Sequence, residues 1–152
     1  MMKEINKEVY LMKKIIVLFV SVLLMICMTG CSKSVDWDKD IKKLEDAGYT
    51  ITNHTSEEDL ASITHELNSW AKFKGYDLTF EVLRFTGVVK NEDYDNQVIM
   101  LQFATEEQAF NYYNFEIETR FEDSVNKYYV YKDIVVCSDN EESMNILGYD
   151  FK

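Results

Sequence analysis

The residues best suited to chemistry in this 152-residue chain are three cysteines and two histidines. Cys137 ends the apolar run Ile134–Cys137, where a cysteine is usually a buried small hydrophobic residue, and nothing near it in the sequence would lower its pKa. His54 and His65 stand eleven residues apart, which matches no zinc-ligand spacing. A nucleophilic arrangement of Cys137, His65 and an acidic residue can be drawn, but no motif brings these groups together. The sequence therefore predicts a protein that is not an enzyme and needs no cofactor.

Carboxylates are the second group of candidates. Asp36, Asp38 and Asp40 alternate like the first ligands of an EF-hand, but the glycine and the glutamate that such a calcium loop needs further on are missing. The strongest remaining metal candidate is a weak calcium site in the polar turn 91–96, whose alternative is a solvated turn. Its ligands would be Glu92, Asp93 and Asp95.

A short apolar segment lies near the start of the chain. Two lysines precede an apolar run from Ile15 to Met28, about 14 residues long and short of the roughly 20 that a membrane-spanning helix needs. Thr29 and Gly30 follow, and then Cys31, whose thiol can be alkylated by lipid. This layout predicts a signal peptide, with an uncleaved anchor or a buried helix as the alternative.

The segment Met12–Cys31 resembles the lipobox-type signal peptide of bacterial lipoproteins, although Met28 stands where that family prefers leucine. The resemblance implies cleavage between Gly30 and Cys31 and a diacylglyceryl group on the Cys31 sulfur. It also implies a protein held on the extracytoplasmic face of the cell membrane, because two acyl chains give stable anchoring. Residues 1–11 are either an extended start of this signal or the result of a misplaced start codon.

Charge narrows the class of partner. Removal of residues 1–30 takes four lysines and two glutamates from a chain of net charge −11, which leaves −13. Such a domain repels phosphate backbones, so nucleic-acid binding is excluded and a cationic protein or peptide is favoured as a partner. A hydrophobic fraction of 47% is enough for a core. We expect residues 31–37 to be the lipidated cysteine with a short tether, and residues 38–152 to be a single acidic domain.

Periodicity divides this domain into helices and strands. Apolar residues at helical spacing precede Gly48 and Gly75, which are predicted to end two helices in the left-handed conformation. Strand-like runs follow at 49–52 and 76–90, and the second run changes phase after Val82, where a bulge is expected. Two helices and two strands are therefore predicted in the first half of the domain.

The second half supplies the remaining elements. The turn 91–96 leads to the apolar run 98–103, which predicts an antiparallel hairpin. A capping box at Thr105–Gln108 opens a helix, residues 128–137 return to strand, and a short helix covers about 140–147. From the first strand onward, this order is that of an α+β ferredoxin-like split β-α-β-β-α-β sheet, with an extra helix at each end.

The helix opened by this capping box carries aromatic residues on more than one side. Phe110, Tyr113 and Ile117 form the expected core stripe, and Tyr112 and Phe115 lie partly off it. Tyr112 and Phe115 are therefore candidates for an exposed aromatic interaction surface, the alternative being a wide apolar face covered by the terminal helices.

Together, these patterns predict a membrane-anchored extracytoplasmic lipoprotein of the cell envelope whose domain is a non-enzymatic binding or interaction module. Its expected partners are the membrane, through lipid on Cys31, and a cationic protein or peptide. The alternatives are a binder of a small ligand or a weakly held metal ion and, with less support, an envelope hydrolase.

Overall fold

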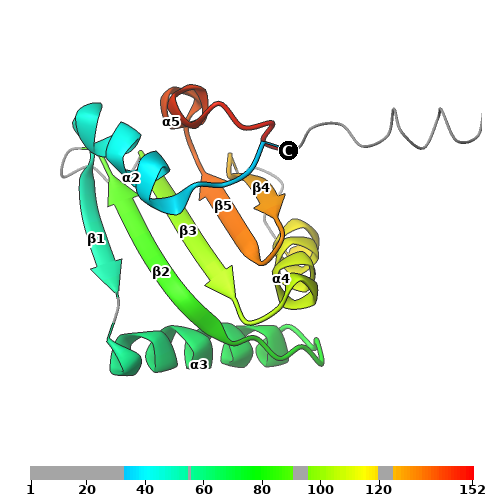
Figure 1. Cartoon of the computed structure of the whole chain (residues 1–152). Coiled ribbons are helices and arrows are strands. Elements are labelled where there is room, and N and C mark those ends of the chain that lie inside the picture. The colour runs from blue at the N-terminus through cyan, green and yellow to red at the C-terminus, as the bar shows by residue number, and fades with distance from the viewer. Residues whose placement is uncertain (1–32, 55, 91–95, 120–124) are drawn as a thin grey trace, which may run out of the picture. The chain divides into compact units, whose positions relative to one another are not determined.

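The computed structural model of the chain describes residues 33–54, 56–90, 96–119 and 125–152. In this part of the chain, four helices and five strands form one unit, Lys33–Lys152 (Figure 1). In chain order the elements are α2 (Trp37–Asp46), β1 (Thr50–His54), α3 (Glu57–Phe73), β2 (Val82–Val89), β3 (Gln97–Phe103), α4 (Glu106–Thr119), β4 (Lys127–Tyr131), β5 (Ile134–Ser138) and α5 (Glu141–Leu147). The predicted α+β class is confirmed, as is an extra helix at each end. The predicted signal peptide of residues 1–30 lies outside the described residues.

The described strands form one antiparallel sheet in the order β1-β2-β3-β5-β4. A ferredoxin-like split sheet would place another strand between the first two strands. Here β1 pairs directly with β2, with Ile51 opposite Val88. The predicted split order is therefore wrong. The run 128–137 forms two strands that turn at Lys132 and Asp133.

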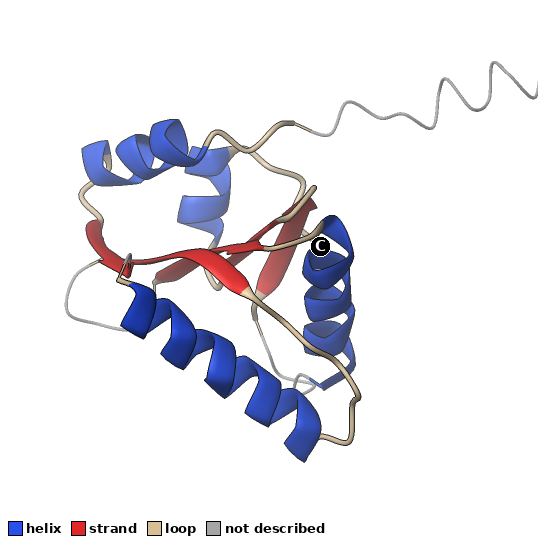
Figure 2. Cartoon of the chain, turned by 60° about the horizontal axis from the view of Figure 1, so that its bottom comes forward, coloured by secondary structure: helices blue, strands red, loops and turns tan. Residues whose placement is uncertain are grey.

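Two helices lie on each face of the sheet (Figure 2). One hydrophobic cluster lies between the sheet and α3 with α4, and a second lies between the sheet and α2 with α5. The central strand β3 supplies both clusters, because successive side chains of a strand point to opposite faces. Leu101 and Phe103 join the α3/α4 cluster, and Val98 and Met100 join the α2/α5 cluster.

The helix ends follow local chemistry. Gly48, Gly75 and Gly148 have φ angles of 86°, 86° and 67°, in the left-handed region that side chains with a Cβ rarely adopt. The capping position before α4 is also confirmed, because the Gln108 backbone N–H donates to the Thr105 hydroxyl at 3.2 Å. These short-range signals place the ends of the helices correctly.

The segment after α3 differs from its prediction. The sequence predicts a strand from residue 76, but β2 begins only at Val82. Asn68 of α3 takes the place of a neighbouring strand, because its side-chain amide accepts from the Phe80 N–H at 2.7 Å and donates to the Phe80 carbonyl at 3.0 Å. The predicted bulge is confirmed, since the β2–β3 register shifts directly after Val82 and skips Leu83.

The folded unit begins at Lys33, earlier than the predicted boundary at residue 38. Trp37, expected in the tether, is the first residue of α2 and is buried. Asp40, one turn further on, is also buried, and its carboxylate accepts from the Lys43 ammonium and from the Tyr149 hydroxyl. The contact with Tyr149 fastens α2 to the C-terminal segment, so α2 belongs to the core.

Candidate functional site

Two groups of predicted site residues lie outside the described residues. They are Gly30 and Cys31 of the lipidation signal and Glu92, Asp93 and Asp95 of the turn between β2 and β3. Within residues 33–54, 56–90, 96–119 and 125–152, no group of three or more His, Cys, Asp or Glu side chains is arranged to hold a metal ion.

The alternating aspartates near the start of the domain have structural roles. Asp36 accepts a hydrogen bond from the Lys39 N–H at 3.3 Å and so caps α2. Asp38 pairs with the Arg84 guanidinium at 2.7 Å. With Asp40 fixed in the core, the three side chains serve separate structural contacts.

The structure keeps Cys137 and the two histidines apart. Cys137 is buried in β5, as predicted, and burial raises the pKa of its thiol to about 12. His54 lies on β1, which β2 and β3 separate from β5, and its ring packs against Phe85 with centroids 5.3 Å apart. His65 is exposed on α3, where its Nε2 lies 3.5 Å from the Ser69 hydroxyl. These positions do not form a nucleophilic arrangement.

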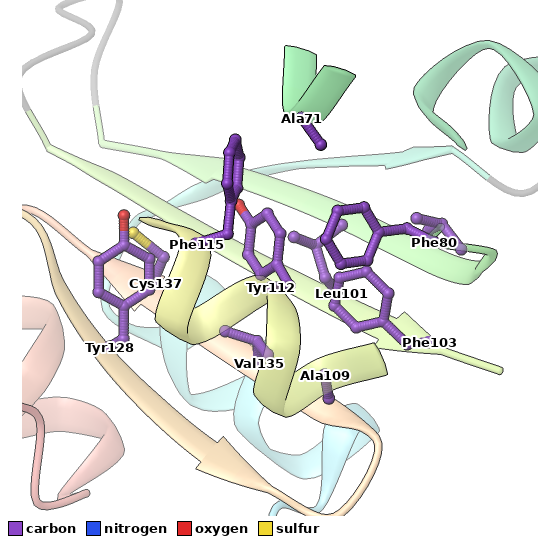
Figure 3. Packing of buried hydrophobic residues seen from close by; sticks show 11 residues of the cluster. Ala71, Phe80, Leu101, Phe103, Ala109, Tyr112, Phe115, Tyr128, Val135 and Cys137 are labelled. Carbon is purple, nitrogen blue, oxygen red and sulfur yellow. The ribbon is translucent and has the colours of Figure 1, made fainter. Parts of the chain in front are cut away.

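The prediction of an exposed aromatic surface on α4 is wrong. Tyr112 and Phe115 are only 8% and 1% exposed and belong to the core cluster of Figure 3. Phe110, expected in the core, is instead 57% exposed. The fully buried Ala109 shares the inner face with Tyr112 and Phe115, and its small side chain lets that face of α4 approach the sheet closely.

A polar group lies within this core, between α4, β4 and β5. The Tyr128 hydroxyl donates to the Glu116 carboxylate at 3.1 Å, and Tyr112 lies on the same face of α4, one turn before Glu116. Cys137 and Tyr128 lie side by side on neighbouring strands, close to Glu116 (Figure 3). Burial raises the pKa of both Glu116 and Tyr128. The Tyr128–Glu116 hydrogen bond therefore links α4 to β4 beside the core.

An exposed aromatic pair lies instead on α3. Trp70 and Phe73 are 42% and 78% exposed, and their rings stack with centroids 5.6 Å and planes 18° apart. The Lys74 ammonium lies 4.6 Å from the centre of the Trp70 ring. Trp70 is one of the apolar residues at helical spacing before Gly75 from which this helix is predicted, and Phe73 lies outside that series. The available signal was the position of Phe73 between Lys72 and Lys74, outside the apolar stripe.

Comparison of the chain with protein-family models, with curated proteins and with solved structures found no match. Among the described residues, no helix combines the length and the apolar character needed to cross a membrane. Function is therefore inferred from the residues and their geometry.

Proposed function

We propose that this chain is a membrane-anchored extracytoplasmic lipoprotein whose folded domain is a non-enzymatic binding module. The resemblance of Met12–Cys31 to a lipobox-type signal supports the anchor. The described unit is compatible with processing at this point, because it starts at Lys33, two residues after Cys31. The two hydrophobic clusters of the described residues are built from positions after Cys31.

The stacked, exposed pair Trp70–Phe73 carries the binding proposal. A Phe ring that is 78% exposed keeps most of its apolar surface in water, and its stacking on Trp70 makes the two rings one continuous surface. Aromatic side chains of this kind provide much of the affinity at protein interfaces, where they fill apolar pockets of the partner. We therefore assign Trp70 and Phe73 as the anchor residues of a protein-binding surface.

The charge of the domain indicates the chemistry of the partner. The mature chain carries −13, and the first turn of α3 alone contributes Glu57, Glu58 and Asp59, all exposed. A negative field of this size attracts a positively charged protein or peptide over a distance comparable to the Debye length, about 10 Å at moderate salt. The proposed partner is therefore a cationic protein or peptide with an apolar pocket for the Trp70–Phe73 pair.

Chemical crosslinking in intact cells tests this proposal. The full-length protein should yield a reproducible protein adduct, and the Trp70→Ala/Phe73→Ala variant should lose it. Phe110→Ala is the matched control, because Phe110 is an exposed phenylalanine on another helix and its removal should leave the adduct unchanged. An adduct that survives in the double variant would show that the pair is not the binding surface.

The anchor is tested separately with Cys31→Ala. This variant should lose metabolic labelling by fatty acid and leave the membrane fraction, whereas Cys137→Ala should do neither, because its thiol is buried in β5. Lipid labelling that persists in the Cys31 variant would refute the anchor.

A further inference from the structure

Lys33, the first described residue, is fixed to the folded domain at both its side chain and its backbone. Its ammonium donates to the Leu147 carbonyl at 2.8 Å, and its own carbonyl accepts from the Tyr129 hydroxyl at 2.5 Å. Only Ser32 stands between Lys33 and Cys31. The Cα atoms of Cys31 and Lys33 can therefore be at most about 7 Å apart. A lipid on Cys31 would bring the surface around Lys33 directly to the bilayer.

This surface carries an unusual share of the basic residues of an acidic domain. Lys127 begins β4, Lys132 lies in the β4–β5 turn, and both are exposed. Lys152 pairs with Tyr128 on β4 through two reciprocal backbone hydrogen bonds of 2.9 Å, with its side chain exposed. With Lys33, four lysines lie on Lys33 itself and on two segments that contact it, β4 with its turn through Tyr129 and residues 149–152 through Tyr149. The same segments contribute three acidic residues, the exposed Asp36, which caps α2, the exposed Asp150, and Asp133, which accepts from Gln102.

Aromatic side chains lie among these lysines. Tyr129 and Tyr149 stack with ring centroids 4.5 Å apart, and Phe151 packs against both at 6.3 and 6.1 Å. The Lys33 ammonium lies 5.4 Å from the Tyr149 ring, and the Lys132 ammonium lies 5.6 Å from the ring of Tyr131. Tyr129 and Tyr149 are buried beneath this surface, whereas Tyr131 and Phe151 are partly exposed, and tyrosine is enriched at the level of lipid headgroups in membrane proteins.

We propose that this tether surface, made up of Lys33, Lys127, Tyr131, Lys132, Phe151 and Lys152, rests on anionic phospholipid headgroups and gives the domain one orientation on the bilayer. The inference rests on the proposed lipidation of Cys31, which supplies the attachment. The lysines supply local attraction to the headgroup phosphates, although the mature chain as a whole is negative.

Site-specific photo-crosslinking in the full-length, acylated protein tests this orientation. A benzophenone amino acid replaces Lys132 in one variant and Phe73 in the other, both exposed positions. The proteins are reconstituted in vesicles of phosphatidylglycerol and phosphatidylcholine, and adducts are identified by mass spectrometry. Position 132 should give lipid adducts at least about tenfold more often than position 73.

Charge variants then test the role of the lysines. A lysine near an anionic surface contributes about fivefold to membrane binding, so Lys127→Glu/Lys152→Glu should lower the lipid adduct at position 132 by at least about fivefold. Lys42→Glu/Lys72→Glu makes the same change in net charge at two exposed positions elsewhere and should leave the adduct unchanged. In vesicles of phosphatidylcholine alone, every variant should give as little lipid adduct at position 132 as Lys127→Glu/Lys152→Glu gives in the anionic vesicles.

Fatty-acid labelling of Cys31 in the same samples separates the two proposals. Labelled protein with equal lipid adducts at positions 132 and 73, or with a protein adduct at position 132, would overturn the orientation and leave the anchor standing. Unlabelled protein in the soluble fraction would overturn the anchor and the orientation with it.

Discussion

Phe115→Ala should destabilise the folded domain by about 3–5 kcal/mol, whereas Phe73→Ala should cost less than about 1 kcal/mol. The two phenylalanines differ in exposure, at 1% and 78%. Phe115 also packs edge-on against Tyr76, with ring centroids 5.2 Å apart, so its removal would lose this contact and leave a cavity. The sequence-based assignment of α4 predicts a mild effect at Phe115, so the experiment distinguishes the two orientations of this helix.

The small loss of stability expected for Phe73→Ala follows from the exposure of this side chain. Complete burial of a phenylalanine contributes about 1.5–3 kcal/mol, and only about a fifth of this side chain is covered, which leaves roughly 0.3–0.6 kcal/mol. Stacking on Trp70 adds about 0.5 kcal/mol or more. The higher helix propensity of alanine offsets about half a kcal/mol of this loss.

Urea unfolding of the Lys33–Lys152 unit, followed by far-UV circular dichroism, measures both changes. Circular dichroism is preferred to tryptophan fluorescence because Phe73 contacts Trp70 directly. With a denaturant dependence of about 2 kcal/mol per molar, Phe115→Ala should lower the midpoint by roughly 2 M. A loss of more than about 2 kcal/mol for Phe73→Ala, or of less than about 1 kcal/mol for Phe115→Ala, would refute the assignment of the inner and outer aromatic residues.

Two further predictions concern the buried polar group beside α4. In the native protein at pH 8, a pKa of about 12 leaves Cys137 with roughly a thousandfold less thiolate than a thiol of ordinary pKa 9.0 has. Cys137 should therefore react with Ellman's reagent only after the protein is unfolded in guanidinium chloride. Labelling of the native protein at the rate of the unfolded protein would contradict this prediction. Glu116→Gln should stabilise the protein at pH 7. Folding raises the pKa of the Glu116 carboxyl, so this group contributes stability at pH values below its unfolded pKa, and that contribution is lost as the pH rises through its folded pKa. Urea midpoints between pH 4 and 8 should decline less steeply in the variant, and a variant less stable than wild type at pH 7 would count against the raised pKa.

Features set by neighbouring residues could be predicted from the sequence. Gly48 and Gly75 end helices because only the local backbone conformation decides whether glycine is needed there. The bulge after Val82 was visible as a change in alternation, and the capping role of Thr105 depends on a residue three positions away. Each of these signals acts within a few residues, so tertiary structure did not need to be known.

Features set by distant contacts could not be predicted in this way. The predicted order strand, helix, strand, strand, helix, strand differs from the observed one only in the division of its last run into β4 and β5, and such an order does not decide which strands pair, such as β1 with β2 through Ile51 and Val88. Residues 76–80 have strand-like composition, but the Asn68 side chain occupies the hydrogen-bonding groups of Phe80. On α4, aromatic residues occur all around the helix, and the choice of Tyr112 and Phe115 as core depends on which face meets the sheet.

The two proposed surfaces are linked by their positions on the sheet. Lys33 contacts α5 and the Tyr129 side chain in the α2/α5 cluster, whereas α3, with Trp70 and Phe73, covers the opposite face (Figure 2). A domain held by so short a connection can offer a partner only the surfaces that face away from the bilayer. Lipid adducts at position 73 in place of position 132 would therefore make the Trp70–Phe73 pair a membrane contact and remove the reason to assign it to a protein partner. The crosslinking experiment thus decides both surfaces at once.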